Sequence, residues 1–201
     1  VLAAGAADAG GDFTSDCADL SDRFLSGKRV RTISLDDASL EDSRAALKNA
    51  LNGGARLLTY LGHGAIDRLG RSGMLTSDDA AGMTNAPHLP VLLAATCIAG
   101  DFSVPGRDCL AEDLVRQPDG GCVAAYAPVT MSLNADSKAL VGDFLKAVYN
   151  DGERRLGDAV LEAVKAAAAA AQKRGDSSDD GATRLFNIIG DPATRLQIPI
   201  R

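Results

Sequence analysis

Short apolar runs alternate with segments of helical period along this chain of 201 residues. Apolar runs bounded by turn residues are typical of buried strands, and apolar residues spaced three and four apart predict the helices between them. The strand-like runs are 1–7, 29–35, 56–61, 90–96 and 121–127. This alternation predicts an α/β fold in which helices flank a mostly parallel central sheet.

Capping residues mark where the predicted helices begin. Ser39 and Asp42 have the spacing of a capping box, and Gly53 and Gly54 end the helix that follows. The other expected starts are Ser15 or Asp16, Asp108 for a short helix over 110–115, and Asp136 or Ser137 for a helix to Tyr149, with a last helix over about 155–173. No internal repeat or linker interrupts the pattern, so we expect one domain over 1–201.

The composition is that of a globular domain with an aliphatic core. Apolar residues make up 46% of the chain and aromatic residues only 4%, with no Trp. A formal net charge of −6 gives no electrostatic reason to expect a nucleic-acid or anionic-membrane partner. No apolar run approaches the roughly 20 residues of a membrane span, so we expect none. The chain begins without Met and without a secretory signal, which predicts a processed piece of a longer protein.

The cysteines and histidines do not have the spacing of a metal site. Cysteines occur at 17, 97, 109 and 122 without a CxxC pair, and the chain has two histidines. We therefore expect neither a metal nor an organic cofactor. A disulfide such as Cys109 with Cys122 stays open. Calcium binding by the acidic stretch 176–180 also stays open, although such a stretch is more typical of a solvated loop.

Two of the apolar strands end on reactive side chains. The run 57–61 leads into Gly62, His63 and Gly64, and the run 91–96 leads into Cys97. If these strands are neighbours in a parallel sheet, His63 and Cys97 lie at the carboxyl edge, where open α/β folds bind their ligands. A lone buried Cys is usually a small hydrophobe, and a lone His after a strand is usually structural. Both at one edge favour a thiol nucleophile with its base.

These two motifs resemble those of a known family. The stretch 59–64, TYLGHG, and the stretch 95–102, ATCIAGDF, in which Cys97 follows His63 by 34 residues, resemble the histidine and cysteine motifs of the gingipain-type cysteine peptidases. These peptidases belong to the caspase-like clan, and further similarity lies at 110–112, 121–127 and 190–192. The resemblance implies a caspase-like three-layer sandwich with a mostly parallel central sheet.

The resemblance also implies what this piece of chain is. It covers nearly the whole of 1–201 as the carboxyl-terminal catalytic subdomain, so the amino-terminal subdomain is absent from this chain. Its partners are then a protein or peptide substrate and the missing amino-terminal part of its own precursor. A secreted or cell-envelope location is favoured by the resemblance, with the bacterial cytoplasm as the alternative.

Carried over by position, the resemblance makes Cys97 the nucleophile and His63 the catalytic partner that protonates the leaving amine. The N–H groups of Gly64 and Cys97 would form the oxyanion hole. Asp8 stands where gingipains carry a glutamate that orients the histidine. The alternative for Asp8 is a loop residue whose carboxylate accepts hydrogen bonds from backbone amides.

Substrate selection rests on two further positions. Asp16 stands where the arginine-specific gingipains seat the substrate side chain, which implies cleavage after Arg or Lys, but Asp is also a preferred helix N-cap. Met131, on the loop after the fifth strand, would line the far wall of that pocket or else belong to the core.

Three classes of function follow. The leading one is a cysteine endopeptidase that acts through an acyl-enzyme. The runner-up is a catalytically silent caspase-like module that binds a partner or serves as a scaffold. An α/β esterase or amidase would need a GxSxG elbow, and the sequence has none.

Overall fold

The computed structural model describes residues 1–174 and 181–198, and a six-stranded sheet lies at its centre. Five strands run parallel, and only the last is antiparallel to its neighbour. In sheet order they are β2 (Thr32–Ser34), β1 (Leu2–Ala4), β3 (Leu57–Leu61), β7 (Val91–Ala95), β8 (Ala124–Pro128) and β9 (Phe186–Gly190). The predicted α/β fold is confirmed. The acidic stretch 176–180 lies outside the described residues.

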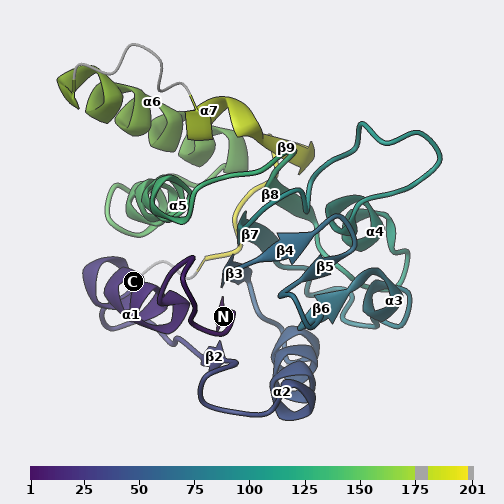
Figure 1. The fold of residues 1–201 in the computed structure, drawn as a ribbon. Coiled ribbons are helices and arrows are strands. Elements are labelled where there is room, and N and C mark those ends of the chain that lie inside the picture. The colour runs from purple at the N-terminus through teal and green to yellow at the C-terminus, as the bar shows by residue number, and fades with distance from the viewer. Residues whose placement is uncertain (175–180, 199–201) are drawn as a thin grey trace.

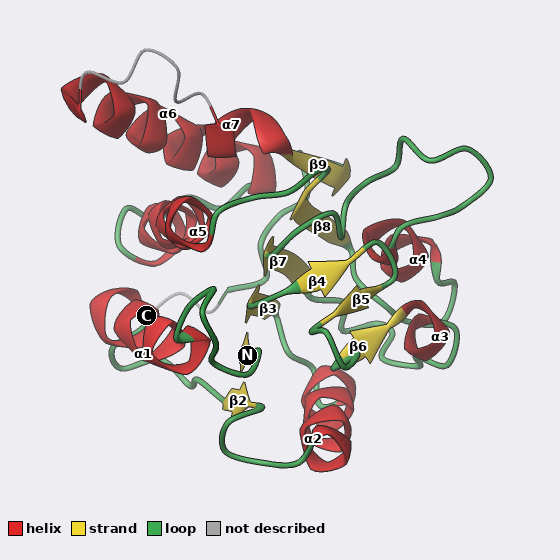
Figure 2. Cartoon of the chain, viewed as in Figure 1, coloured by secondary structure: helices red, strands yellow, loops and turns green. Residues whose placement is uncertain are grey.

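Helices cover both faces of the sheet and make three layers (Figures 1 and 2). One face carries α1 (Phe13–Phe24), α5 (Asn134–Tyr149) and α6 (Leu156–Arg174), and α7 (Gly181–Leu185) leads from there into β9. The other face carries α2 (Leu40–Asn52), α3 (Ser77–Ala80) and α4 (Leu110–Arg116). This is the sandwich that the resemblance implied.

The strands β3 and β7 are buried on both faces, so their side chains divide between two cores. Leu57 and Leu61 of β3 join the core under α1, α5 and α6, whereas Leu58 and Tyr60 join the core under α2 and α4. The same alternation runs along β7. A strand with helices above and below has no polar face, which explains why both runs are continuously apolar in the sequence.

Several short elements were not predicted from the sequence. A small antiparallel sheet follows β3 and consists of β4 (Gly64–Ala65), β5 (Arg68–Leu69) and β6 (Leu75–Thr76). The short α3 follows β6, and β9 pairs with β8. Strands of two residues and a helix of four have too few residues to show a period, which is why the pattern missed them.

Two of the predicted helix starts were wrong by a few residues. Helix α1 begins at Phe13 because the Asp12 side chain accepts a hydrogen bond from the Ser15 N–H at 2.9 Å, so neither Ser15 nor Asp16 is the cap. Helix α5 begins after Leu133, ahead of the expected Asp136 or Ser137, and has no side-chain cap. The missing cap is why the sequence carried no start signal there.

Of the starts predicted for α2 and α4, one is confirmed and the other was wrong. The prediction for α2 is confirmed, since Ser39 Oγ accepts from the Asp42 N–H at 3.1 Å. The prediction for α4 was wrong, because Cys109 is its N-cap residue and the Glu112 carboxylate accepts from the Cys109 N–H at 3.0 Å. Asp108 instead forms an ion pair with Arg116.

A buried carboxylate ties α2 to α3. Asp79 accepts from Arg44 Nη2 at 2.7 Å and from Lys48 Nζ at 2.5 Å, and it forms a capping box with Thr76. Only 6% of its side chain is exposed. Burial alone would raise the pKa of Asp79, but the hydrogen bonds from Lys48 and Thr76 and the charge of Arg44 lower it below its ordinary value.

Replacing Asp79 by Ala should lower the free energy of unfolding by about 2–3 kcal/mol, because a helix cap and charge-assisted hydrogen bonds are lost together. Because the pKa of Asp79 is lower in the folded than in the unfolded protein, its carboxylate stabilises the fold at pH values above the unfolded pKa of about 3.9. This contribution is lost as the pH falls through the folded pKa. The deficit, measured by urea unfolding at pH 7 and pH 3, should therefore shrink in acid. Asp78→Ala, an exposed neighbour, is the control; equal deficits for both variants would contradict the assignment.

Candidate active site

The register of two central strands brings His63 and Cys97 to one edge of the sheet. Strands β3 and β7 are parallel neighbours with Leu61 opposite Ala95, and each reactive residue follows two positions later. The Gly62 N–H donates to the Ala95 carbonyl at 3.1 Å, which continues the pairing past the strand ends. A Cβ atom on Gly64 would collide with Thr96 Oγ1, so only glycine lets these two segments pack this closely.

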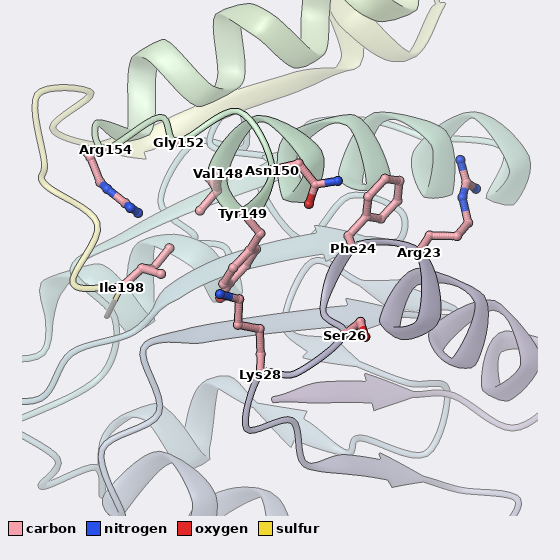
Figure 3. Close-up of a pocket in the computed structure, with 10 residues that line it drawn as sticks. All are labelled: Arg23, Phe24, Ser26, Lys28, Val148, Tyr149, Asn150, Gly152, Arg154 and Ile198. Carbon is pink, nitrogen blue, oxygen red and sulfur yellow. The ribbon is translucent and has the colours of Figure 1, made fainter. Parts of the chain in front are cut away.

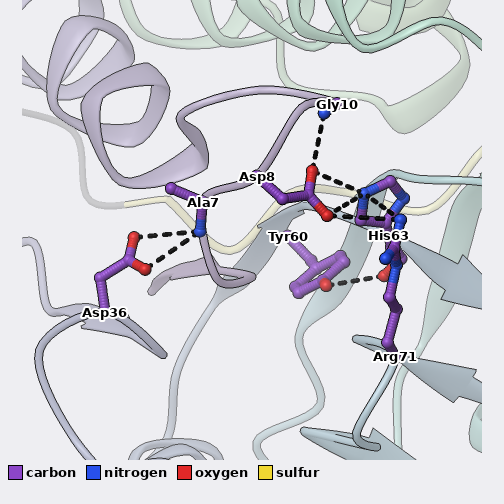
Figure 4. A network of polar contacts seen from close by, with 7 residues as sticks. All are labelled: Ala7, Asp8, Gly10, Asp36, Tyr60, His63 and Arg71. Atoms are coloured by element: carbon purple, nitrogen blue, oxygen red, sulfur yellow. Dashed lines mark hydrogen bonds and ion pairs between the residues drawn. The ribbon is translucent and has the colours of Figure 1, made fainter.

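Asp8 holds the His63 ring. Its two carboxylate oxygens lie 3.1 and 3.0 Å from His63 Nε2 (Figure 4). The same carboxylate accepts from the Gly10 N–H at 2.7 Å. Hydrogen bonds from His63 and then Gly10 lower the pKa of Asp8. The Asp8 carboxylate thus contacts both the imidazole and a backbone amide, and an Asp side chain is long enough to reach the ring.

Further contacts fix the orientation of the imidazole. The His63 carbonyl accepts from Tyr60 Oη and from the Gly70 N–H, both at 2.7 Å. The Phe13 ring meets the imidazole nearly edge to face, with centroids 5.5 Å apart. Asp8 engages Nε2, and the other ring nitrogen, Nδ1, has no hydrogen-bond partner within residues 1–174 and 181–198.

Sequence reasoning missed Arg71, which lies in the turn between β5 and β6. Its Nη2 is 3.3 Å from Asp8 Oδ2 and 3.2 Å from His63 Nε2 (Figure 4). A guanidinium only donates, so Nε2 cannot accept from Arg71 while it donates its proton to Asp8. The ion pair with Asp8 is compatible with that tautomer. No motif marks an exposed arginine in a turn.

The Cys97 thiol lies on a strained segment against the loop that follows β8. It is half-buried, and its Sγ donates to the Ser132 carbonyl at 3.6 Å. The next residue, Ile98, has a φ of 45°, a left-handed conformation that is rare for a β-branched side chain and that clusters at functional sites. The Ile98 N–H donates to Thr130, whereas the Cys97 N–H has no acceptor among the described residues. That amide is therefore available to an oxyanion.

The other three cysteines are buried structural thiols. Burial raises the pKa of Cys17 and of Cys122 to about 12 and that of Cys109 to about 11. All four cysteines are free, so Cys109 and Cys122 do not form a disulfide in this structure.

The two predicted substrate-binding residues lie near the start of α5. Met131 precedes this helix in the chain, and Asp16 contacts its first residue, Asn134. Asp16 lies in the first turn of α1, where its carboxylate accepts from Lys138 Nζ at 2.8 Å and from Asn134 Nδ2 at 2.9 Å. Met131 is 73% exposed and does not belong to the core. Its loop is the one that contacts Cys97 through Ser132.

Two hollows of the molecule lie elsewhere. One of about 550 Å³ lies between the carboxyl ends of α1 and α5, where Lys28, Tyr149 and Arg154 line it (Figure 3). An adjoining one of about 880 Å³ reaches Leu57, at the amino end of β3. Because the strands are parallel, this is the edge opposite Cys97, and neither hollow belongs to the candidate site.

The described residues contain neither a metal-binding cluster nor a membrane-spanning helix. Across 1–174 and 181–198, no three His, Cys, Asp or Glu side chains group in a way that could hold a metal ion. None of the helices described there has the length and the apolar composition to cross a bilayer.

The sequence is similar to a known peptidase family over almost its whole length. The model of peptidase family C25 matches residues 2–197. The chain belongs to peptidase family C25. Over 89 residues it is 36% identical to gingipain R2 of Porphyromonas gingivalis and equally to gingipain R1 of that organism, a match that covers 43% of this chain and 12% and 9% of those proteins. The family that the two motifs indicated is confirmed.

Solved structures show the same fold for this C25 chain. The crystal structure of the Arg-specific cysteine proteinase gingipain R superposes with a TM-score of 0.76 at 22% identity, covering 97% of this chain and 46% of that one. The complex of the Porphyromonas gingivalis RgpB pro- and mature domains gives a TM-score of 0.75 at 22% identity, covering 96% and 47%. The chain thus spans just under half of each of these solved chains and about a tenth of the curated relatives.

Iodoacetamide should label Cys97 alone in the native protein. Cys97 is half-buried, whereas Cys17, Cys109 and Cys122 are buried thiols whose raised pKa suppresses the reactive thiolate. Peptide mass mapping after brief alkylation at pH 7.5 measures this, and unfolding in urea should expose all four. Native labelling of any of the other three, or none at Cys97, would contradict the placement.

Proposed function

We propose that this chain is the catalytic unit of a cysteine endopeptidase, with Cys97 as nucleophile and His63 as its acid–base partner. The observation that carries the proposal is the β3–β7 register, which delivers both residues to one edge, together with the Asp8 carboxylate on the His63 ring. Membership of family C25 supports the same chemistry.

In the first half of the reaction, His63 takes the proton of the Cys97 thiol, and the resulting thiolate attacks the scissile carbonyl carbon and forms a C–S bond. The carbonyl oxygen becomes an oxyanion, which the N–H groups of Cys97 and Gly64 stabilise. His63 then gives a proton to the leaving amine, the C–N bond breaks, and an acyl-enzyme thioester remains.

In the second half, His63 removes a proton from water as the water attacks the thioester. The C–S bond breaks, the carboxylic product leaves, and the thiol is restored. Asp8 is a positioning residue: it holds the proton of the imidazole on Nε2, which leaves Nδ1 to exchange protons with thiol and substrate.

The proposal also concerns the rest of the precursor. We propose that residues 1–201 form a catalytic subdomain whose substrate is a protein or peptide and whose natural partner is an amino-terminal subdomain. The chain spans less than half of the solved gingipain R chain, which leaves room for such a partner. A complex of pro- and mature domains exists for the related RgpB.

Cys97→Ala should abolish cleavage of a peptide library and leave the fold intact, because the small side chain fits where the thiol lay. His63→Ala should lower kcat by about 10²–10⁴, the contribution of general acid–base catalysis. Cleavage is followed by mass spectrometry and folding by circular dichroism. His88→Ala is the matched control, because His88 is an exposed histidine beside the hollow at the opposite edge of the sheet. Cleavage that survives Cys97→Ala would refute the mechanism, and no cleavage or active-site labelling by the wild type would favour the silent module.

Asp8→Ala should lower kcat by about tenfold or more with little change in KM, because Asp8 touches the catalytic ring rather than the substrate. Asp8→Glu should recover most of the loss. Asp36→Ala is the control, since Asp36 accepts from the Ala7 N–H of the same loop at 3.0 Å and does not contact His63 (Figure 4). Equal losses for Asp8→Ala and Asp36→Ala would mean that Asp8 only supports the loop.

A further inference from the structure

The Asp16 carboxylate forms an ion pair with a lysine of the same chain. Lys138, on α5, places its ammonium 2.8 Å from Asp16 Oδ1 and 3.0 Å from Asp19 Oδ2 on α1. Asp19 also pairs with Arg23 at 3.3 Å. Two carboxylates thus meet two cations, and this charge cluster of Asp16, Asp19, Arg23 and Lys138 has no net charge to offer a substrate.

The central pair of this cluster is well shielded from solvent. The exposed fractions are 19% for the Asp16 side chain and 24% for Lys138. Partial burial alone would lower the pKa of Lys138, but hydrogen bonds to Asp16 and Asp19 raise it, so the ammonium stays charged. The hydrogen bond from Lys138 likewise lowers the pKa of Asp19. Removing either ion of such a pair leaves a shielded charge without a partner, which is costly.

The charge cluster is connected to both reactive groups through the first turns of α1 and α5. Helix α5 begins at Asn134, two residues after Ser132, whose carbonyl accepts from the Cys97 thiol. Helix α1 begins at Phe13, whose ring contacts His63. Asn134 joins the two sides, because its amide donates to Asp16 at 2.9 Å and a Cβ on Gly11 would lie only 2.6 Å from it.

Exposed apolar side chains occur on two chain segments next to Cys97. Six large hydrophobic side chains of the described residues are exposed, and four of them lie on the two segments that flank Cys97. Met131 and Leu133, each 73% exposed, lie on the loop that contacts the thiol, and Phe102 at 54% and Val104 at 37% follow Cys97. Exposed apolar side chains rimming a candidate site are typical of a binding surface.

We propose that Lys138 determines specificity: by neutralising Asp16 it directs the site to peptides with an uncharged, apolar residue before the scissile bond, which Met131 and Leu133 contact. This inference rests on the proposed peptidase function. A substrate arginine would have to displace Lys138 from two carboxylates and leave its ammonium shielded and unpaired, whereas an apolar side chain displaces only water.

The test measures kcat/KM for peptides that differ only in the residue before the scissile bond. The wild type should cleave after Leu or Met at least tenfold faster than after Arg. Lys138→Gln leaves Asp16 with an uncompensated charge and should raise cleavage after Arg at least tenfold. Lys138→Gln with Asp16→Asn should lose that gain, and Lys138→Arg should keep the wild-type profile. Lys146→Gln removes an ion-paired lysine from the far end of the same helix and is the matched control.

The outcomes separate this inference from the function on which it rests. A wild type that prefers Arg, and loses that preference on Asp16→Asn, overturns the inference and leaves the peptidase standing. So does a folded Lys138→Gln without any gain for Arg. If Lys138→Gln does not fold, the wild-type and Lys138→Arg profiles decide. If the wild type shows no Cys97-dependent cleavage and is not labelled by peptidyl ketones carrying Leu or Arg, both the inference and the proposed peptidase function are overturned.

Discussion

The parallel pairing of β3 with β7 is the interaction on which the candidate site depends. Leu61 lies opposite Ala95, and because the strands are parallel, the same number of residues beyond that pair brings each chain to the same edge. Both strands are buried on both faces, so a slip of one residue would exchange the side chains of the two cores. The core thereby fixes the register, and the register fixes where His63 and Cys97 emerge.

Around that edge, each reactive group has a neighbouring element that holds it. The loop after β1 brings Asp8 to the imidazole, and the loop after β8 brings Ser132 to the thiol. Helices α1 and α5 begin at the ends of these two loops and are joined by the Asp16–Lys138 ion pair. The proposed catalytic and specificity residues are thus connected through one continuous set of contacts.

Membership of family C25 and the gingipain fold give this arrangement a chemical setting, but they do not determine substrate choice. An aspartate can attract a basic side chain only when its charge is unpaired. Here the carboxylate that resemblance assigns to a basic substrate residue has an internal ammonium within 2.8 Å. Relatives can share a fold and a nucleophile and still differ in specificity through one residue on a neighbouring helix.

The sequence alone was sufficient to predict the α/β class, the strands that end at His63 and Cys97, and the Ser39 cap. Each of these depends only on the local spacing of apolar residues or on the identity of neighbouring residues. It placed the start of α1 wrongly because Asp12, Ser15 and Asp16 are all acceptable caps, and the structure uses Asp12. Only the tertiary structure decided that Arg71 forms an ion pair with Asp8 and that Met131 is exposed. It also decided that Lys138 pairs with Asp16, which lies 122 positions earlier in the sequence. These contacts join residues far apart in the chain, and no local pattern specifies which distant side chain the packing of two helices will bring to a carboxylate.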